Sequence, residues 1–401
     1  MTNKHTTNSR RSTRWLQRGV RKHEGRQRMH PHRRLSACMT IHNTSTTPAV
    51  ASTQLVNQPL LKIALDVHLA WHVIAVQEDG SSPKPPQRFK PADFLKWIEQ
   101  RLAAGYRLIT CYEAGPFGYG LHRQLTALGV TNYVIRPRNW DDQHTRIKTD
   151  RTDALSMLNA LDRFVAGNRK ALALVHVPTE TQERRRTQTR LRQSLVRDLK
   201  MIAGRARGVA LQYGFRMKGD WYGRRSWPKW QRQLPGWLIT LITPLHDSAL
   251  FLHDQIKMLS DQIEAASVRP RPKGMGGLTE QLLDREVGDW QRFKNRRQVS
   301  SYLGLCPSEN SSGQRHQQGH VTKCGNPRLR WALTELAWRL VRFQPEYRLT
   351  QKWKPRLLDP HATSGRRKQA LVALARGFGV DWWRICTGQT TPEKVGLQMG
   401  V

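Results

Sequence analysis

Short apolar runs alternate with polar turns in the segment that begins at Leu60. The runs LLKIALDVH (60–68) and WHVIAV (71–76) are rich in β-branched residues and lie a few residues apart, which predicts two strands joined as a hairpin. The runs YRLITCYEA (106–114) and NYVIRP (132–137) predict two further strands.

Helical spacing of apolar residues occurs between and after these strands. It predicts helices at 91–105, with Gly105 as the stop, at 118–129, and at 149–167, with Thr149 or Asp150 as the cap. The prolines at 83–86 predict a turn. Elements in this order predict an α/β layer with a mixed sheet, of which the hairpin forms one part.

Longer helices are predicted from about Pro178 to Ala266. The segment 180–212 is charged and helical, and a second helix is expected near 245–267. Two long helices joined by an elbow indicate a helical hairpin or coiled-coil arm suited to dimerisation. Packing is favoured over base stacking for the four tryptophans of the elbow, which are Trp221, Trp227, Trp230 and Trp237. From 274 to about 395 the pattern is compact and mostly helical.

Composition adds a large positive charge, because 67 Lys and Arg stand against 30 Asp and Glu and leave a net charge of +37. Such a surplus repels itself unless a polyanion shares the surface, and DNA or RNA binding releases a counterion for each neutralised phosphate. Residues 1–58 are basic and poor in core-forming residues. They are predicted to be a disordered arm, or else to lie partly outside the functional protein.

Membrane and secreted classes are disfavoured by the same sequence. No apolar stretch approaches the roughly 18 residues of a spanning helix, and the basic start lacks the apolar run of a secretory signal. The five scattered cysteines include no C-x-x-C pair, which favours a reducing cytosol. We therefore expect a bacterial-type cytoplasmic, nucleoid-associated protein with no membrane partner.

Four carboxylates occupy positions that invite a chemical explanation. Asp66 interrupts an apolar strand, where an unpaired charge is costly, and Glu113 ends the next strong strand before a Gly-Pro turn. Asp150 and Asp153 are three residues apart at a helix start and share a face. Oxygen ligands converging at one sheet edge suit Mg²⁺ or Mn²⁺, which support phosphodiester transfer. Taken singly, the last three residues also fit a turn acid, a helix cap and a first-turn acid.

A second candidate site lies at 302–330. Ser311 and Ser312 precede Gly313 in a loop that is predicted to be flexible, and several basic residues follow. A serine attacks phosphorus only if its proton is removed and the developing charge is offset, and basic side chains supply the second requirement. By spacing alone, Ser-Ser-Gly is ordinary loop chemistry and favours no nucleophile.

Two weaker patterns lie nearby. His316, His320 and Cys324 recur every four residues but lie among glycines, where the continuous helix that would join them into a metal site is not expected. The segment KGMGG (273–277) opens a predicted helix, which either offers backbone N–H groups to a phosphate or is an ordinary helix start.

Six motifs in this order resemble one family, the DEDD transposases of insertion sequences. These are relatives of the Piv/MooV site-specific DNA invertases and are known as bridge-RNA-guided recombinases. The motifs are LDVH, YEAGPFGYGLHRQL, VIRPRNWDDQHTRIKTDRTDA, PKGMGGLTEQLLDREVGDWQRF, SYLGLCPSENSSG and GHVTKCGNPRLRWALTELAW. The resemblance spans about residues 60 to 395. This chain differs in its long basic arm, in GMGG where a G-x-G turn is typical, and in its double serine.

The resemblance implies more than spacing does. It implies a RuvC-like, RNase H-type first domain in which Asp66, Glu113, Asp150 and Asp153 bind Mg²⁺ or Mn²⁺. It implies a C-terminal domain whose serine forms a phosphoserine link to DNA. The family's serine precedes a glycine, which corresponds to Ser312, with Ser311 as the neighbouring alternative. The metal site of one subunit would act with the serine of another, in a tetramer of two dimers that holds donor and target DNA paired to a non-coding RNA.

Together these inferences divide the chain into four parts. They are a disordered basic arm (1–58), a RuvC-like catalytic domain (59–177), a helical dimerisation arm (178–268) and a mostly α C-terminal transposase domain (269–395). The predicted activity is that of an RNA-guided transposase or site-specific recombinase that cuts and rejoins DNA. Two alternatives stay open: a RuvC-type structure-specific endonuclease that uses metal-activated water, and a non-enzymatic basic nucleic-acid-binding protein.

Overall fold

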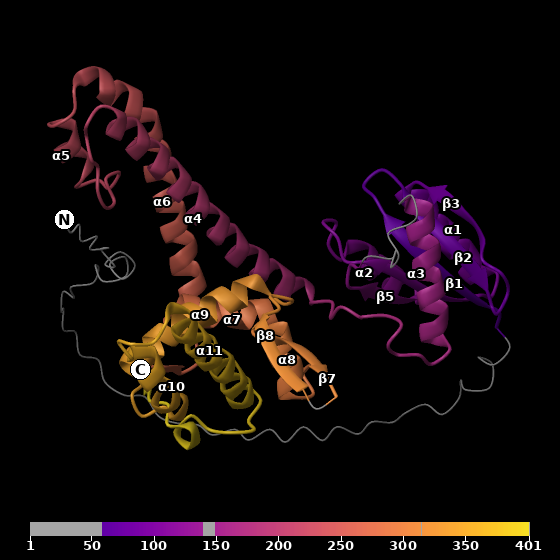
Figure 1. The fold of residues 1–401 in the computed structure, drawn as a ribbon. Coiled ribbons are helices and arrows are strands. Elements are labelled where there is room, and N and C mark those ends of the chain that lie inside the picture. The colour runs from indigo at the N-terminus through magenta and orange to yellow at the C-terminus, as the bar shows by residue number, and fades with distance from the viewer. Residues whose placement is uncertain (1–57, 139–148, 314, 401) are drawn as a thin grey trace, which may run out of the picture.

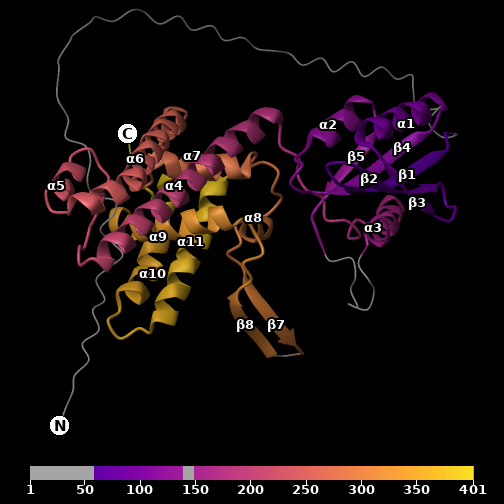
Figure 2. The same ribbon diagram turned by 90° about the horizontal axis from the view of Figure 1, so that it is seen from above.

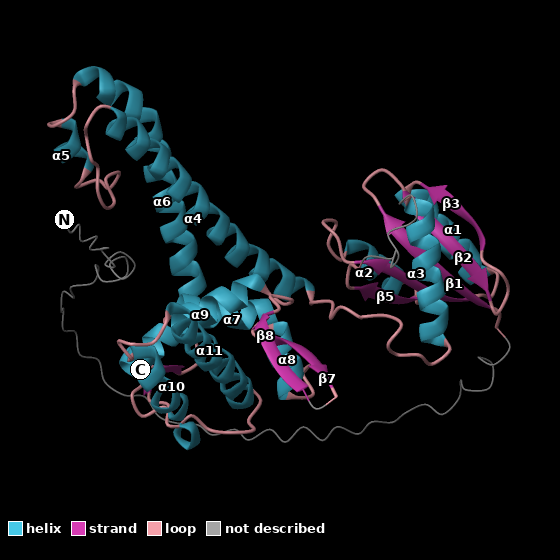
Figure 3. Ribbon diagram, in the orientation of Figure 1, coloured by secondary structure: helices cyan, strands magenta, loops and turns pink. Residues whose placement is uncertain are grey.

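The computed structural model describes residues 58–138, 149–313 and 315–400. Nearly all of the predicted basic arm, 1–58, therefore lies outside the described residues. Along the chain, a sheet with flanking helices is followed by a pair of long helices and then by a helical C-terminal part that carries a β-hairpin (Figures 1 and 3).

A five-stranded mixed sheet forms the first part, with strand order β3-β2-β1-β4-β5. β2 is antiparallel to β1 and β3, whereas β1, β4 and β5 are mutually parallel. The predicted hairpin and both later strands are confirmed. The strands are β1 (Leu60–Val67), β2 (His72–Glu78), β3 (Lys84–Phe89), β4 (Arg107–Glu113) and β5 (Thr131–Ile135).

The predicted turn at the prolines is wrong, because Pro85 and Pro86 lie inside strand β3. β3 pairs only with β2 and forms one edge of the sheet. Proline has no N–H to donate, but at an edge the outward side of the strand has no neighbour to receive it. The edge position therefore tolerates a sequence that reads locally as a turn.

The predicted helices cover both faces of the sheet. They are α1 (Pro91–Ala103), α2 (Gly120–Ala127) and α3 (Asp150–Val165). Ile63 and Leu65 of β1 pack in the core with α1 and α2, whereas Ala64 between them packs against α3 (Figure 2). Side chains alternate along a strand, so Asp66 lies on the same face as Ala64, toward α3.

Two long helices, α4 (Glu180–Gln212) and α6 (Gly236–Ala265), run side by side and form the predicted helical hairpin (Figure 1). The second helix begins well before the expected 245 and contains Pro244. A proline inside a helix costs about 3 kcal/mol. Leu238 and Ile242 of α6 are buried in one apolar cluster with residues of α4. Each buried side chain contributes about 2 kcal/mol, so together they exceed the cost of the proline.

The elbow of this hairpin contains the short helix α5 (Trp227–Gln231). Trp221 is fully buried, and its Nε1 donates to the Ala203 carbonyl at 3.3 Å. Trp227 is buried and stacks on His246, with ring centroids 4.5 Å apart. The packing interpretation is confirmed for these two tryptophans, whereas Trp237 is 53% exposed.

The C-terminal part has its own apolar core, which includes Trp290, Trp382 and Trp383. Two short strand pairs accompany its helices. The elements are β6 (Arg271–Pro272), α7 (Gly277–Val287), α8 (Arg296–Tyr302), β7 (Pro307–Ser312), β8 (Arg315–Val321), α9 (Pro327–Phe343), α10 (Arg348–Leu358), α11 (Ser364–Cys386), a 3₁₀ turn (Glu393–Val395) and β9 (Met399–Gly400).

A buried ionic junction ties the long helices to this part. The Glu286 side chain of α7 is fully buried and accepts two hydrogen bonds from Arg190 of α4, at 2.8 and 2.9 Å. Asn326, which caps α9, donates a third from Nδ2 at 2.7 Å. One buried carboxylate therefore accepts hydrogen bonds from both α4 and the start of α9.

Replacing Glu286 by Gln is expected to lower the free energy of unfolding by about 2 kcal/mol, because a neutral amide replaces the buried carboxylate that accepts two hydrogen bonds from Arg190. Urea unfolding of full-length protein measures this loss. Glu335→Gln on the exposed face of α9 is the matched control and is expected to stay within about 0.5 kcal/mol of wild type.

The pH dependence of this effect has a defined sign. Burial would raise the pKa of Glu286, but the hydrogen bonds and charge of Arg190, with Asn326, hold its pKa below the ordinary 4.5. The contribution of the carboxylate is therefore complete above pH 4.5 and is lost as the pH falls below it. The difference in free energy of unfolding between wild type and Glu286→Gln should become smaller only in that acidic range. A smaller difference near neutral pH would contradict a Glu286 carboxylate that is ionised there.

Candidate metal and serine sites

Strand pairing brings the first two predicted carboxylates to one edge of the sheet. β1 and β4 are parallel, and Leu65 pairs with Tyr112. Asp66 and Glu113 each follow by one residue, so they lie side by side and on the face toward α3. The backbone N–H of Arg138 donates to Glu113 Oε1 at 3.3 Å.

The start of α3 supplies the other two carboxylates. Thr149 caps the helix: its hydroxyl accepts from the Thr152 N–H, and the Thr149 N–H donates to the Thr152 hydroxyl. This capping box fixes the first turn, which carries Asp150 and Asp153. The cap expected at Thr149 or Asp150 is therefore Thr149.

Asp66, Asp150 and His68 form a compact cluster. Their nearest side-chain ligand atoms all lie within 4.8 Å of one another. His68 Nε2 is 3.3 Å from Asp66 Oδ2 and 3.4 Å from Asp150 Oδ2. Burial raises the pKa of Asp66 above its ordinary value; His68 opposes the rise, and the charges of Asp150 and Asp153 add to it. The distant acids at 66 and 150 therefore meet in the fold.

Sequence reasoning missed His68 as a member of this site. A signal was present, because His68 follows Asp66 by two residues and period-two alternation puts both on one face. The turn after β1, closed by a 3.0 Å hydrogen bond from the His68 N–H to the Trp71 carbonyl, carries the imidazole back over the acids.

The cluster fits a divalent cation. Although Nε2 of His68 lies close to two carboxylates, it is buried without a hydrogen-bond partner of good geometry. Its imidazole lies between the two carboxylates, and the three side chains together could hold one divalent cation. Two carboxylates from the cluster, together with the nearby Asp153, give the oxygen-rich donor set that Mg²⁺ and Mn²⁺ prefer.

The predicted serines occupy the tip of a β-hairpin rather than a flexible loop. Ser311 and Ser312 end β7, Gly313 turns with φ 56°, and β8 returns antiparallel. Positive φ is the conformation that glycine adopts most readily. Ser311 and Ser312 alternate across the strand, and the Ser311 hydroxyl donates to Glu309 Oε1 at 2.9 Å. Both serines are exposed.

The serines and the acids are not brought together within one chain. In both views the β7–β8 hairpin projects from the C-terminal part and lies clear of the sheet that carries Asp66 and Glu113 (Figures 1 and 2). Any reaction that uses both groups would need a second chain or a large rearrangement.

The first of the two weaker patterns does not form a site in the described residues. The segment with His316 and His320 is strand β8, and Cys324 lies beyond its end, so no helical face unites them. The start of α7 at Gly277 is buried against side chains of Glu264, Ser267 and Arg271. Gly277 is therefore packed against protein, whereas the N-cap Gly276 before it is exposed, and phosphate binding at this helix start stays a prediction.

Comparison with known proteins relates these features to transposases. The family model described as "Transposase IS116/IS110/IS902 family" matches residues 271–351. Two proteins of Sinorhizobium fredii, "Putative transposase y4qE" and "Putative transposase y4rJ", are 31% and 30% identical to the chain. The first alignment covers 69% of this chain and 70% of the relative, and the second covers 73% and 80%. The chain belongs to the IS116/IS110/IS902 transposase family.

A third relative extends this transposase family across species. The "Transposase for insertion sequence element IS1111A" of Coxiella burnetii is 25% identical over 67% of this chain and 75% of its own length. The family model covers the serine hairpin but not the carboxylate cluster of this transposase. None of its described helices is both long and apolar enough to cross a membrane.

Proposed function

We propose that this transposase cuts and rejoins DNA through two separate sites, a metal-binding carboxylate site on an RNase H-like sheet and a serine nucleophile at the hairpin tip. The observation that carries the proposal is the convergence of Asp66, His68 and Asp150 within 4.8 Å, in a member of a transposase family. The strand order β3-β2-β1-β4-β5, with α3 over the acids, supports the RuvC-like assignment.

Asp66, Glu113, Asp150 and Asp153 are the proposed metal ligands, and His68 is added to them. When bound, a divalent cation would neutralise charge on the scissile phosphate and on the leaving oxygen. The protein residues hold that region rigid, because Asp66 and Glu113 are fixed by paired strands and Asp150 by the capping box of α3. Because these carboxylates are already in place, they would bind the positive charge of the cation without rearranging.

Ser312 is the proposed nucleophile. Its hydroxyl oxygen would bond to phosphorus as the bond from phosphorus to one sugar oxygen breaks. The serine gives up its proton and the departing sugar hydroxyl gains one, so a phosphoserine ester and a free strand end form. Attack by another sugar hydroxyl on this ester reverses the sequence and joins strands. The ester stores the energy of the broken phosphodiester bond.

Assembly on DNA and RNA completes the proposal. Since the hairpin and the acids of one chain lie apart, the serine of one subunit would serve the metal site of another. The net charge of +37 is consistent with more than one nucleic-acid partner, and a non-coding guide RNA is proposed from the family resemblance. The helical hairpin α4–α6 would supply dimer contacts.

Binding of Mn²⁺ tests the carboxylate site directly. Wild type is expected to bind Mn²⁺ in a titration followed by electron paramagnetic resonance. Asp150→Asn should weaken binding at least about tenfold, since even residues behind the ligands typically contribute that much. Asp93→Asn, an exposed first-turn acid of α1, is the matched control. Equal binding by Asp150→Asn and wild type would remove Asp150 from the proposed site.

A further inference from the structure

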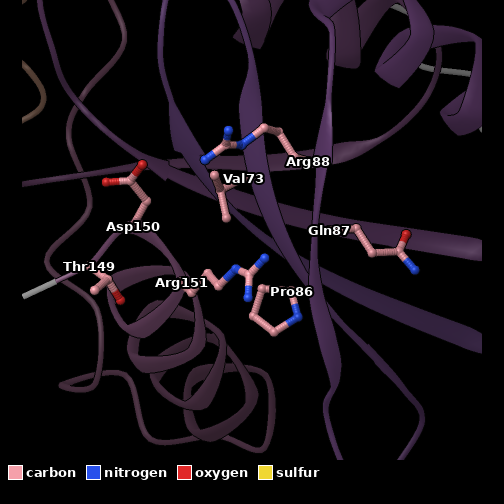
Figure 4. A pocket seen from close by; sticks show the side chains of 7 residues that line it. All are labelled: Val73, Pro86, Gln87, Arg88, Thr149, Asp150 and Arg151. Atoms are coloured by element: carbon pink, nitrogen blue, oxygen red, sulfur yellow. The ribbon is translucent and has the colours of Figure 1, made fainter.

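A cavity of about 480 Å³ lies beside the carboxylate cluster and shares Asp150 with it. Its other walls come from strand β2, from edge strand β3 and from the start of α3, and they include Arg88 and Arg151 (Figure 4). Both arginines are exposed, so the cavity is open to a ligand from solvent.

The two arginines have charges that the described protein does not neutralise. Among the described residues, neither guanidinium forms an ion pair with a carboxylate, although Asp150 stands in the same wall. Planar guanidinium groups bind phosphate oxygens in pairs, so two of them around one cavity suit a phosphodiester.

An aromatic surface borders the same region. Arg88 lies over the ring of Trp71 with its guanidinium carbon 4.8 Å from the centroid, and Trp71 is 39% exposed. Trp71 belongs to the turn that also carries His68. One turn therefore links the cluster to an exposed ring, and exposed rings stack with bases of single strands at about 1–3 kcal/mol per base.

We infer that Arg88 and Arg151 bind the DNA backbone next to the phosphate that is cut, with Trp71 against the adjoining base. This inference rests on the proposed function, since it treats the carboxylate cluster as the cutting site. The arginines would act as positioning residues: they hold a neighbouring phosphate, so that the strand enters the cluster in one register.

Fluorine NMR of full-length protein with 5-fluorotryptophan tests the cavity. The chain has 14 tryptophans, and Trp71→Phe identifies the Trp71 resonance. Titration with tetrathymidylate is expected to shift this resonance saturably in wild type. Arg151→Ala should weaken the binding seen there about tenfold or more, the usual scale for a hydrogen bond to a charged group. Arg163→Ala, an exposed arginine near the other end of α3, is the matched control.

The outcomes separate this inference from the proposed function. Asp66→Asn should lose DNA cleavage yet keep the tetrathymidylate shift, because the cavity does not use Asp66. Equal affinity for tetrathymidylate in wild type and Arg151→Ala, or an equal loss of affinity in Arg163→Ala, would overturn DNA binding in the cavity. Neither result would affect the proposed metal site. Preference for tetrauridylate over tetrathymidylate would overturn its assignment to DNA.

Discussion

Asp66→Asn is expected to reduce DNA strand cleavage by about 100-fold or more. The change keeps the shape of the side chain but removes the charge at the centre of the cluster with His68 and Asp150. Loss of groups that merely support metal ligands typically costs 10–100-fold, roughly, so loss of a ligand should exceed that range. The assay follows a supercoiled plasmid that carries the insertion element encoding this chain, with Mg²⁺ and RNA transcribed from the segments that flank its gene.

Asp93→Asn is the control for this loss and should cleave like wild type, because Asp93 is exposed on α1, across the sheet from the cluster. Thermal unfolding of both variants confirms that the fold is kept. Cleavage by Asp66→Asn at the wild-type rate would rule out the carboxylate site and favour a non-enzymatic nucleic-acid-binding role for this region.

Ser312→Ala is expected to reduce the covalent protein–DNA adduct by about a thousandfold or more, since alanine has no oxygen to bond to phosphorus. Denaturing gels of labelled DNA after incubation with protein, RNA and Mg²⁺ measure the adduct. Ser308→Ala is the matched control, because Ser308 is an exposed serine on the same strand β7. Omission of the RNA should remove the adduct if the guide is required.

Other outcomes of the adduct assay would point to a different nucleophile or a different reaction. An adduct that survives Ser312→Ala but not Ser311→Ala would move the nucleophile by one residue, to the serine whose hydroxyl contacts Glu309. Nicking by wild type without any adduct would favour the endonuclease that uses metal-activated water. Mixing Asp66→Asn with Ser312→Ala should restore the adduct if sites from different chains combine, and no restoration would contradict that arrangement.

The place of each acid within its own strand or helix could be foreseen from the sequence, because local rules decide it. Alternation along β1 and β4 sets the face of Asp66 and Glu113, and the parallel pairing of the strands brings their ends together. The Thr149 cap sets where α3 begins, so Asp150 and Asp153 fall in its first turn. Apolar periodicity and caps depend on neighbours in sequence, and these features were predicted correctly.

The edge strand β3 and the turn that carries His68 depend on contacts made only in the folded chain. Pro85 and Pro86 signal a turn locally, yet β2 offers a strand edge that β3 can occupy without the missing N–H groups. The spacing of two residues indicates only that His68 shares a face with Asp66, whereas its approach to Asp150 depends on the fold. The strand pairing of β3 and the contact between His68 and Asp150 each need a partner that the chain reaches only after folding.

The sequence by itself determined strands β1, β2, β4 and β5, the start of α3, the charge surplus and the order of the acids and serines, since these depend on residue type and short-range periodicity. Tertiary structure alone decided that Asp66 and Asp150 meet, that Arg88 and Arg151 line one cavity, and that Ser312 stands at a hairpin tip away from the acids. Such contacts join residues far apart in the chain, and only the packing of the sheet, arm and C-terminal core sets the distances between them.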